Sequence, residues 1–327
     1  MKRLIDKKIA YFFGYVQKSH TLAMVKAFNS SLYALSKHYP SIKHFNLSET
    51  RSLIDGIFRS VTDSISATID TLMSGDSRIH REYSIDEKIP HWDDLQFQEV
   101  MITPPPPIGS SVTIESPSQP MRIKIAPQPF AEGAQKIAYH ALTENGKHLV
   151  LKQSKYSDPR SNSIKRCLET AQVHAIAVNY ASVFNSDKPY NVDSSEIQFV
   201  RVGVMEVTDE QYFTYEEHLS SSNRYTKFTS NFGYVPEHED HTLNSTCQAF
   251  SHYTWVKSGK KVVICDLQGI KFGSRVILTD PAIHSYSNVL CHGSTNLGPR
   301  GIEEFFQKHK CNEFCAEMNL ERPDNTA

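Results

Sequence analysis

Near the end of the sequence, one histidine and two cysteines lie within seven residues, in the segment HKCNEFC. His309, Cys311 and Cys315 are of the types that bind zinc. A structural zinc site is almost always four-coordinate, so a fourth ligand would have to come from elsewhere in the chain. The segment also fits a helix with two buried thiols, because free cysteine is commonly buried. The local pattern therefore leaves both interpretations open.

A second group of residues offers oxygen ligands. The segment KKVVICDLQG ends an apolar, strand-like run with Asp266, and Gln268 follows two residues later. Carboxylate and amide oxygens suit Mg²⁺. Asp280 follows in LTDP. Of the two aspartates, one could bind a metal and the other could accept or donate a proton. Aspartate at a strand end is also a common turn former, and the spacing does not decide between these roles.

The third group contains lysines. The segment QPFAEGAQKIAYHALTENGKHLVLKQS predicts strand, turn and strand, with an Asn-Gly hairpin signal in ENGK. Gly133 permits close backbone approach, Lys136 follows it, and Lys152 lies on the second strand. A strand lysine near a glycine-containing hairpin is one way to hold ATP phosphates. Taken alone, a lysine in the position of Lys152 is more often a surface residue at a strand end.

These residues must be positioned by a fold that contains both helices and strands, and the sequence after residue 121 predicts such a fold. A long helix is expected at SIKRCLETAQVHAIAVNYASVF, and another at GIEEFFQKHKCNEFCAEMNL. Strands are expected at RIKIA, HLVLKQS, EIQFVRVGVMEV and KKVVICDLQGI. We therefore predict an α+β catalytic domain over residues 121–320.

The earlier residues lack a concentrated set of reactive side chains. Leu53, Ile57, Val61 and Ile65 recur every four residues, which predicts a helical region over residues 1–100. We expect this region to serve packing or self-association.

Two polar segments flank the predicted catalytic domain. Residues 101–120 contain Pro104 to Pro107 and small polar residues, which predicts a linker or a surface excursion. Residues 321–327 are expected to form a polar tail.

Composition narrows the class of protein. The chain has 327 residues, 39% apolar and 22% charged, with a net charge of −1, so nucleic acid is not an expected partner. No apolar run reaches about 18 residues, so no membrane association is expected. The start, MKRLIDKKIAYFFGYV, has no small-residue cleavage site, and six cysteines in a chain this long do not predict a disulfide framework. We expect a cytoplasmic protein.

Several motifs together resemble the alpha-kinase family, the atypical protein kinases of the myosin heavy chain kinase, elongation factor 2 kinase and channel-kinase type. The resemblance covers residues 121–320, and its motifs occur in the family's order. They are PFAEGAQKIAYHA, VLKQS, YFTYEEHL, RYTKFTSNFG, FSHYTW, VVICDLQGI, LTDPAIHS, GSTNLGPRGI and FFQKHKCNEFC.

This resemblance implies a two-lobed, kinase-like fold that binds ATP between the lobes and phosphorylates protein Ser or Thr, with Thr favoured. By position, Lys152 is the phosphate-contacting lysine and Glu216 the glutamate near the adenine. Asp266 and Gln268 match the magnesium-holding pair, and Asp280 matches the aspartate that accepts the proton of the substrate hydroxyl. Lys152, Asp266 and Asp280 are thus the implied catalytic residues.

The resemblance also implies a zinc site and a glycine-rich segment. His252 in FSHYTW is the implied fourth zinc ligand, beside His309, Cys311 and Cys315, whereas Cys291 and His292 are local competitors. The glycine-rich segment GSTNLGPRG is placed in the second lobe. Its marked residues are Gly293, Asn296, Gly298 and Gly301.

Two departures from the family pattern qualify the implied activity. Lys136 stands where the family usually has Arg, which keeps the charge of a nucleotide-binding residue but loses the bidentate fork. The segment between DLQG and LTDP is a few residues longer than usual, which affects the placement of Asp280. The alternative function is an inactive pseudokinase that binds nucleotide or a partner without turnover.

Overall fold

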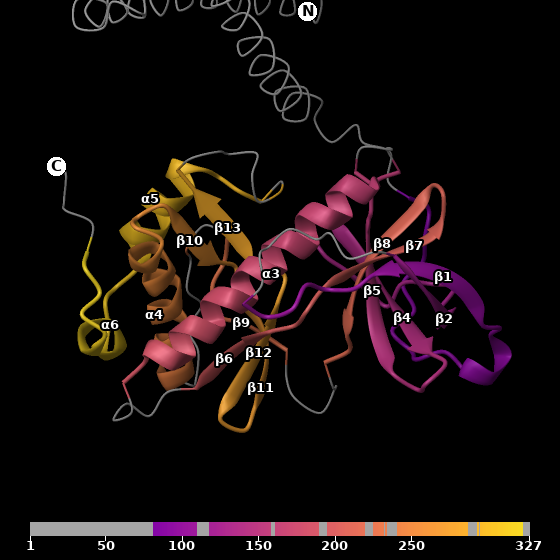
Figure 1. Ribbon diagram of the computed structural model, residues 1–327, viewed down its shortest axis with the longest axis horizontal. Helices are drawn as coiled ribbons and strands as arrows, with labels where there is room; N and C mark the ends of the chain where they lie inside the picture. Colours follow the sequence, from indigo (N-terminus) through magenta and orange to yellow (C-terminus); the bar gives the residue numbers. More distant parts are fainter. Residues whose placement is uncertain are drawn as a thin grey trace, which may run out of the picture. The chain divides into compact units, whose positions relative to one another are not determined.

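The computed structural model describes residues 81–109, 118–157, 161–189, 195–219, 225–231, 233, 241–286, 293 and 295–322. The chain divides into two compact units, Met1–Arg78 and Ile79–Ala327. The first unit, which carries most of the predicted helical region, lies outside the described residues. The second unit folds into two lobes joined by a long helix (Figure 1).

Seven antiparallel strands build the N-terminal lobe, in the order β2-β1-β7-β8-β5-β4-β3. Strand β2 also pairs with β4, so six of the strands close into a ring. On β1, Val100 and Ile102 point into the ring and alternate with the more exposed Met101, as expected for a strand with one buried face. The strands are β1 (Gln98–Thr103), β2 (Gln119–Ile125), β3 (Ala131–Glu132), β4 (Lys136–Thr143), β5 (His148–Ser154), β7 (Gly203–Thr208) and β8 (Gln211–Glu217).

The catalytic unit begins earlier than the sequence predicted. Strand β1 lies within the predicted helical region and linker, yet it pairs with both β2 and β7. A short 3-10 helix, η2 (Trp92–Asp94), precedes it. Residues 104–109 contact helix α3, because the Gly109 backbone N–H donates to Asn179 Oδ1 of that helix at 2.8 Å. Arg201 adds two 3.0 Å hydrogen bonds to the carbonyls of Pro105 and Pro106. These residues are part of the lobe rather than a spacer before residue 121.

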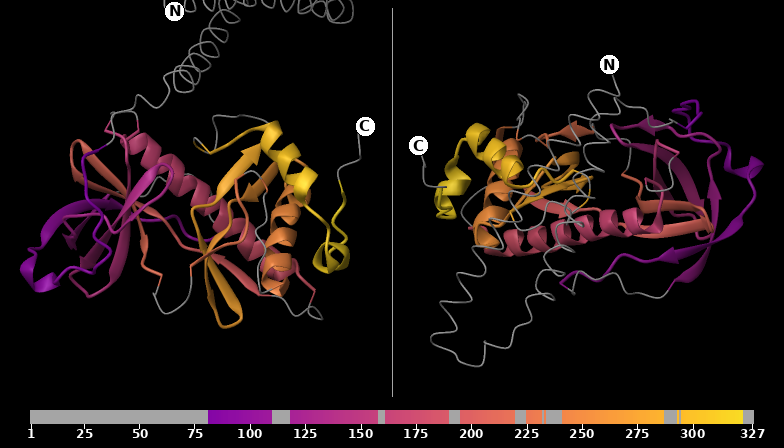
Figure 2. Two further views of the ribbon diagram at one scale, coloured as in Figure 1. Left: turned by 180° about the vertical axis from the view of Figure 1, so that it is seen from behind. Right: turned by 90° about the horizontal axis from the view of Figure 1, so that it is seen from above.

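Helix α3 (Ile164–Asp187) passes from one lobe to the other (Figure 2). Ser163 caps its N-terminus by accepting a hydrogen bond from the Arg166 backbone N–H. Its buried positions recur every three or four residues, which is the period of one helix face. They are Cys167, Ala171, Val173, His174, Ala177, Ala181 and Phe184.

The C-terminal lobe combines two small sheets with three helices. A four-stranded sheet has the order β6-β12-β11-β9, and β10 pairs with β13 beside it. Helix α4 packs against β10 and α6, and α5 packs against β13. The elements are β6 (Glu196–Phe199), β9 (Thr226–Lys227), β10 (Val262–Cys265), β11 (Gln268–Phe272), β12 (Arg275–Thr279), β13 (Ala282–Ser285), α4 (His241–Lys257), α5 (Pro299–Lys308) and α6 (Glu313–Glu317).

Most predicted elements after residue 121 are confirmed, but three predicted segments each form two elements. EIQFVRVGVMEV forms β6 and β7, and KKVVICDLQGI forms β10 and β11, with the two strands of each segment in different sheets. The predicted single helix over GIEEFFQKHKCNEFCAEMNL is two helices, because α5 ends at Lys308 and α6 begins at Glu313. The Asn312 side chain caps α6 by accepting a hydrogen bond from the Cys315 backbone N–H. Cys311 therefore lies between the helices and does not share a helix face with Cys315.

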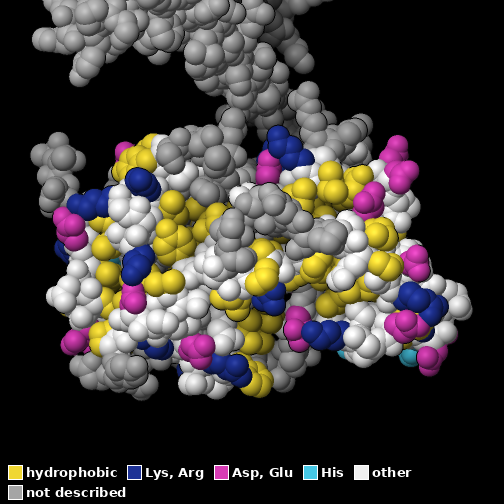
Figure 3. Space-filling view, in the orientation of Figure 1, with side chains coloured by type: hydrophobic (Ala, Val, Ile, Leu, Met, Phe, Trp, Pro, Cys, Tyr) yellow, Lys and Arg dark blue, Asp and Glu magenta, His cyan; other side chains and the backbone are white. Residues whose placement is uncertain are grey.

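The distribution of charged side chains on the surface and the apolar character of the described helices both fit the composition of the chain. Basic and acidic side chains mix over both lobes on the face shown in Figure 3, so the small net charge conceals no large block of one sign on that face. Among the described helices, none combines the length and apolar character needed to cross a bilayer.

Candidate active site

A cleft of about 900 Å³ lies between the lobes and collects the predicted site residues. Strands β4, β5 and β8 and helix α3 line it from one side, and β9, β11 and the turn after β12 from the other. Seven of the predicted site residues line this cleft: Lys136, Lys152, Glu216, Asp266, Gln268, Asp280 and Gly293.

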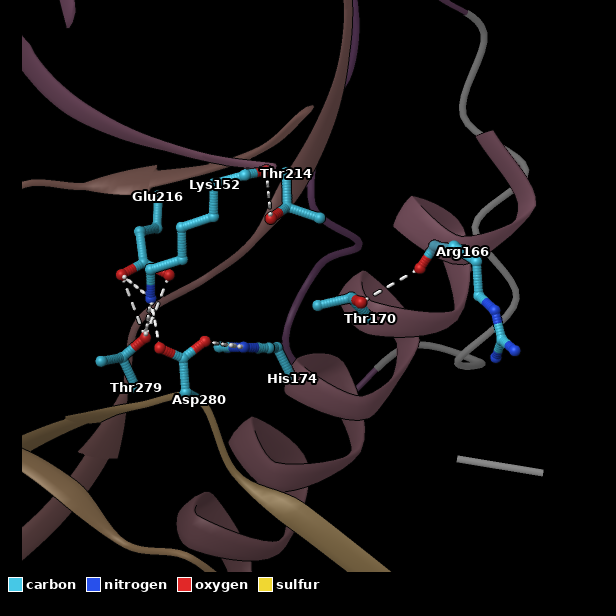
Figure 4. Close-up of polar contacts among 8 residues, drawn as sticks. All are labelled: Lys152, Arg166, Thr170, His174, Thr214, Glu216, Thr279 and Asp280. Carbon is cyan, nitrogen blue, oxygen red and sulfur yellow. Dashed lines mark hydrogen bonds and ion pairs between the residues drawn. The ribbon is translucent and has the colours of Figure 1, made fainter. Parts of the chain in front are cut away.

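Lys152 joins the two lobes at the centre of the cleft. From β5, its Nζ lies 2.8 Å from Glu216 Oε1 of β8 and 2.6 Å from Asp280 Oδ2, which follows β12 (Figure 4). Thr279 Oγ1 accepts a hydrogen bond from Lys152 Nζ at 3.1 Å and donates to Glu216 at 3.0 Å. The resemblance placed Glu216 near the adenine, and its carboxylate fixes the position of the central lysine.

These contacts hold Lys152 and Asp280 as an ion pair. Burial opposes the charge on Lys152, but the carboxylates of Asp280 and Glu216 outweigh it and raise the pKa of Lys152. Burial alone would raise the pKa of Asp280, but the Lys152 ammonium reverses that shift and holds this pKa well below its usual range. Asp280 is therefore an anion throughout the range in which a protein works.

Asp266 has a different environment from Asp280. Its Oδ1 pairs with Lys227 Nζ of β9 at 2.7 Å. Burial raises the pKa of Asp266, although the hydrogen bond and charge of Lys227 act in the opposite direction. Gln268 begins β11, and its Cα pairs with that of Thr279 on β12, so Gln268 and Asp280 lie near each other across this ladder.

Both aspartates have a backbone conformation that is unusual for a residue other than glycine. The φ angle is +58° at Asp266 and +50° at Asp280. Aspartate tolerates this left-handed region better than most side chains, but it still carries backbone strain. Such strain concentrates at functional sites, where the fold fixes a side chain in a required direction.

Lys136 is the second lysine of the cleft. It begins β4, opposite the end of β5, and its Cα pairs with that of Ser154. Burial lowers the pKa of Lys136, while the nearby Asp280 carboxylate opposes this shift. The residue therefore supplies positive charge to the cleft but loses it at lower pH than an exposed lysine.

The sequence prediction missed two residues that reach the central ion pair. His174 of α3 is 2% exposed, and its Nε2 lies 3.9 Å from Asp280 Oδ1. Burial lowers the pKa of His174 to about 3, so the imidazole is neutral at pH 7. In the sequence His174 lies within the predicted helix SIKRCLETAQVHAIAVNYASVF, and nothing in its surroundings marks it as a site residue. Thr279 precedes Asp280 in LTDP and carried no separate signal.

The glycine-rich segment divides into cleft and scaffold residues. Gly293 lines the cleft and has a φ of +79°. Asn296 Oδ1 accepts hydrogen bonds from the backbone N–H of Ser285 at 3.1 Å and of Gly298 at 2.8 Å, so this amide fixes the entry to α5. At Gly301, a Cβ would lie 2.4 Å from the His284 ring, so close packing requires glycine there.

His252, His309, Cys311 and Cys315 come together away from the cleft, and their candidate ligand atoms all lie within 4.8 Å of one another. His309 Nε2 is 3.2 Å from His252 Nδ1 and 3.6 Å from Cys315 Sγ, and Cys311 Sγ is 3.7 Å from His252 Nδ1. Tetrahedral zinc would need edges of about 3.4 Å between nitrogens and about 3.5 Å between nitrogen and sulfur. The four residues thus fit a closed zinc site, and Cys291 and His292 lie outside the described residues.

Contacts beyond these four residues support the same arrangement. His252 Nε2 lies 2.9 Å from the Glu321 carbonyl, and His309 Nδ1 lies 3.4 Å from Gln248 Oε1. These contacts leave His252 Nδ1 and His309 Nε2 to face a metal. Arg322 Nε donates to Cys311 Sγ at 3.0 Å, so the first residues of the predicted polar tail contact the site. Burial and the neighbouring His252 lower the pKa of His309 to about 3, which keeps it neutral, as a metal ligand must be.

The cleft residues also fit a nucleotide with its magnesium. Asp266, Gln268 and Asp280 present hard oxygen ligands. Lys136 and Lys152 present positive charge to the same space, as a triphosphate requires.

Comparisons with known proteins agree with this geometry. The profile of the alpha-kinase family matches residues 131–315. Alpha-protein kinase vwkA of Dictyostelium discoideum is 33% identical over 346 residues, which cover 99% of this chain and 54% of vwkA. Eukaryotic elongation factor 2 kinase of Rattus norvegicus is 31% identical over 224 residues, which cover 64% of this chain and 28% of that protein. The chain thus spans about half of the first relative's length and less of the second.

Solved structures give the same result in three dimensions. An alpha kinase from Entamoeba histolytica superposes with a TM-score of 0.59 at 26% identity, covering 71% of this chain and 95% of that one. The alpha-kinase domain of myosin-II heavy chain kinase A in complex with AMP-PNP superposes with a TM-score of 0.58 at 25% identity, covering 70% of this chain and 97% of that one. Because the family profile spans more than half of the sequence and the fold matches its catalytic domains, the chain belongs to the alpha-kinase family.

Proposed function

We propose that this chain is a cytoplasmic protein serine/threonine kinase that transfers the γ-phosphate of ATP to a protein hydroxyl, with threonine favoured. The observation that carries this proposal is the ion-paired set of Lys152, Glu216 and Asp280, which links the two lobes at the centre of a 900 Å³ cleft. Relatives are named as protein kinases, and related domains have been solved with AMP and AMP-PNP.

Positioning and charge neutralisation carry most of the catalysis in phosphoryl transfer. Lys152 and Lys136 would contact the phosphates, and Glu216 would hold Lys152 in place by its 2.8 Å ion pair. Bound Mg²⁺ would neutralise charge on the phosphate oxygens.

The environments of the two aspartates favour an exchange of the roles that the resemblance implied. Asp280 is a permanent anion next to Gln268 across the β11–β12 ladder, so we assign these two residues to magnesium. Asp266 has the raised pKa, which makes it the better acceptor for the proton of the substrate hydroxyl. Lys227, at 2.7 Å from Asp266, would keep that carboxylate oriented.

Transfer of labelled phosphate to a generic basic protein, with ATP and Mg²⁺, tests the proposal. Asp266→Asn should lower kcat at least about 100-fold without changing the Mg²⁺ requirement, because it removes the proton acceptor. Asp280→Asn should raise the Mg²⁺ concentration needed for half-maximal rate, because it removes a ligand charge. The opposite pattern would return the roles to the assignment implied by the resemblance.

The same assay distinguishes a kinase from a pseudokinase. A folded wild-type chain that binds nucleotide but transfers no more phosphate than Asp266→Asn would be a nucleotide-binding module. This test for a pseudokinase is needed because Lys136 stands where the family usually has Arg, and Lys lacks the bidentate fork.

We further propose one structural zinc per chain, held by His252, His309, Cys311 and Cys315. Four protein ligands leave no open coordination position, so this zinc would stabilise the fold rather than take part in catalysis. Elemental analysis should find about one zinc per wild-type chain and less in Cys315→Ala. A zinc-free wild type with full stability would contradict the proposal.

A further inference from the structure

His284 of β13 is a buried histidine that lies outside both the cleft lining and the candidate zinc ligands. It belongs to the motif LTDPAIHS, four residues after Asp280, and its side chain is fully buried. Strand β13 pairs with β10, which ends directly before Asp266 (Figure 1). The ring therefore lies next to the strand that delivers one of the two cleft aspartates.

Two backbone groups fix the protonation of the His284 ring. The Leu297 backbone N–H donates to Nδ1 at 3.0 Å, and Nε2 lies 2.7 Å from the Asn231 carbonyl oxygen. A backbone N–H can only donate and a carbonyl oxygen can only accept, so Nδ1 is unprotonated and Nε2 carries the hydrogen. Burial lowers the pKa of His284, which favours the same neutral ring.

The His284 ring joins segments that are distant in the sequence and meet at the cleft. Asn231 and Thr295 both line the cleft, and the Asn231 side-chain amide donates to the Thr295 carbonyl at 3.2 Å. Cys265 Sγ lies 3.3 Å from His284 Nε2 and 3.7 Å from the Asn231 carbonyl oxygen. His284 thus connects the end of β10, the segment of Asn231 and the glycine-rich segment.

Residues 227–231, which we call the shelf segment, hold the chain on both sides of Asp266. Directly after this aspartate, the Leu267 backbone N–H donates to Thr229 Oγ1 at 2.8 Å. Directly before it, the Cys265 thiol contacts the carbonyl at the end of the shelf segment. The lysine that begins the shelf segment pairs with the Asp266 carboxylate at 2.7 Å. The position of the shelf segment therefore sets the direction of the Asp266 side chain.

We propose that His284 is a positioning residue for phosphoryl transfer, which holds the shelf segment through the Asn231 carbonyl and so directs Asp266 towards the substrate hydroxyl. This inference rests on the proposed function, because it needs phosphoryl transfer in the cleft. The contact with Leu297 serves only to anchor the ring. Lys136 and Lys152 lie on other strands, so nucleotide binding should not depend on His284.

Two substitutions separate the two hydrogen bonds of the ring. The amide of asparagine reaches the position of Nδ1 and can accept from the Leu297 N–H, whereas the amide of glutamine reaches the position of Nε2 and can donate to the Asn231 carbonyl. His284→Asn therefore keeps the anchor and loses the shelf segment, and His284→Gln does the reverse. Each variant loses one neutral hydrogen bond, so urea unfolding should show similar losses of stability.

Transfer of labelled phosphate to a basic protein by the full chain measures the consequence. His284→Asn should lower kcat about 10-fold to 100-fold, because a small displacement of a reacting group is costly, and should leave KM for ATP within about twofold. His284→Gln should keep kcat within about threefold of the wild type. Equal kcat in the two variants would overturn the proposal, because the contact with Asn231 would then make no difference to the reaction.

Nuclear magnetic resonance tests the contacts themselves. Nitrogen-15 spectra of the wild-type imidazole should show the hydrogen of His284 on Nε2, and a hydrogen on Nδ1 would overturn the proposal even if neither variant folds. Hydrogen exchange of the Leu297 amide should quicken in His284→Gln and stay slow in His284→Asn. The reverse pattern would show that the two substitutions do not separate the contacts as the proposal requires.

The wild-type rate keeps this inference apart from the proposed function. If the folded wild type transfers no phosphate with ATP and Mg²⁺, the proposed function fails and the inference fails with it. If the wild type is active and His284→Asn has the same kcat, only the inference fails.

Discussion

At the scale of single residues, burial and neighbouring charges together set the charge states of the cleft side chains. Lys136, Lys152, His174, Asp266 and Asp280 lie on several segments of the sequence, and the pKa of each is shifted by at least one of the others. The cleft is therefore a coupled electrostatic unit, in which one substitution shifts the protonation of its neighbours. Two predictions concern single members of this unit.

Lys136→Arg should keep nucleotide affinity at alkaline pH. Burial lowers the pKa of Lys136, so the wild type loses this positive charge at a lower pH than an exposed lysine would. We therefore expect KM for ATP in the wild type to rise as the pH rises. Arginine stays charged at every working pH and offers a bidentate fork. We expect equal or lower KM in the variant at pH 7 and a flatter KM profile up to pH 9. A steeper profile in the variant would contradict the role of Lys136.

His174 should make the protein less stable as pH falls. Its folded-state pKa of about 3 lies below the ordinary value, so the unfolded chain binds the extra proton between these two values. The stabilising contribution of the neutral His174 is complete above about pH 6.5 and is lost as the pH falls from there towards about 3. The loss amounts to about 2 kcal/mol by pH 5.

Urea unfolding at pH 7, 6 and 5 tests this expectation. The free energy of unfolding should fall less steeply with pH in His174→Gln than in the wild type, because glutamine does not titrate. Equal slopes would show that His174 does not carry this dependence.

At the scale of elements, the sequence predicted the strands and helix α3 well, because their periodicity is local. It could not predict the break between α5 and α6, since residues 309–312 contain no Gly or Pro that would mark a helix end and the break depends on the Asn312 cap. It also could not predict the positive φ at Asp266 and Asp280, which lie where the chain passes between two different sheets, from β10 to β11 and from β12 to β13. Both features decide where ligands point, so the sequence identified the site residues but not their geometry.

Arg322→Ala should weaken retention of zinc. Cys311 is the half-buried member of the four candidate ligands, and the Arg322 guanidinium lies 3.0 Å from its sulfur. This cation stabilises the thiolate, and such outer contacts are worth about tenfold or more in metal affinity. Transfer of zinc to a chromogenic chelator should be correspondingly faster in the variant. Arg300→Ala, at an exposed arginine of α5, is the control, and equal rates in both variants would contradict the role of Arg322.

Gly269→Ala should destabilise the C-terminal lobe. A Cβ at Gly269 would lie 2.0 Å from the Ile277 carbonyl oxygen on the paired strand β12, so the two strands would have to separate. We expect a loss of about 2 kcal/mol or more in the free energy of unfolding. Gly273→Ala provides the control, because no atom lies within 4 Å of its Cβ and only its φ of +60° carries a cost, of about 1 kcal/mol. Equal losses in both variants would show that β11 and β12 accommodate the methyl group.

At the scale of the whole molecule, the family assignment followed from motif order, whereas the extent of the catalytic unit did not. The motifs lie between Pro129 and Cys315, and residues 81–109 carry none of them. Their place in the fold depends on pairing with strands far along the chain, such as β1 with β7, which a local pattern cannot show. Long-range pairing is thus the part of this fold that sequence reasoning missed.

The closed ring of the N-terminal lobe has a consequence for any fragment of this protein. A fragment that began at residue 131, where the family match begins, would lack β1 and β2. Strands β7 and β4 would then each carry an unpaired ladder of backbone N–H and C=O groups, and the apolar interior around Met205 would open to solvent. Open strand edges of this kind recruit other chains and lead to aggregation. The shortest fragment that stays soluble is therefore set by backbone hydrogen bonding, and its boundary lies before β1 rather than at the first recognisable motif.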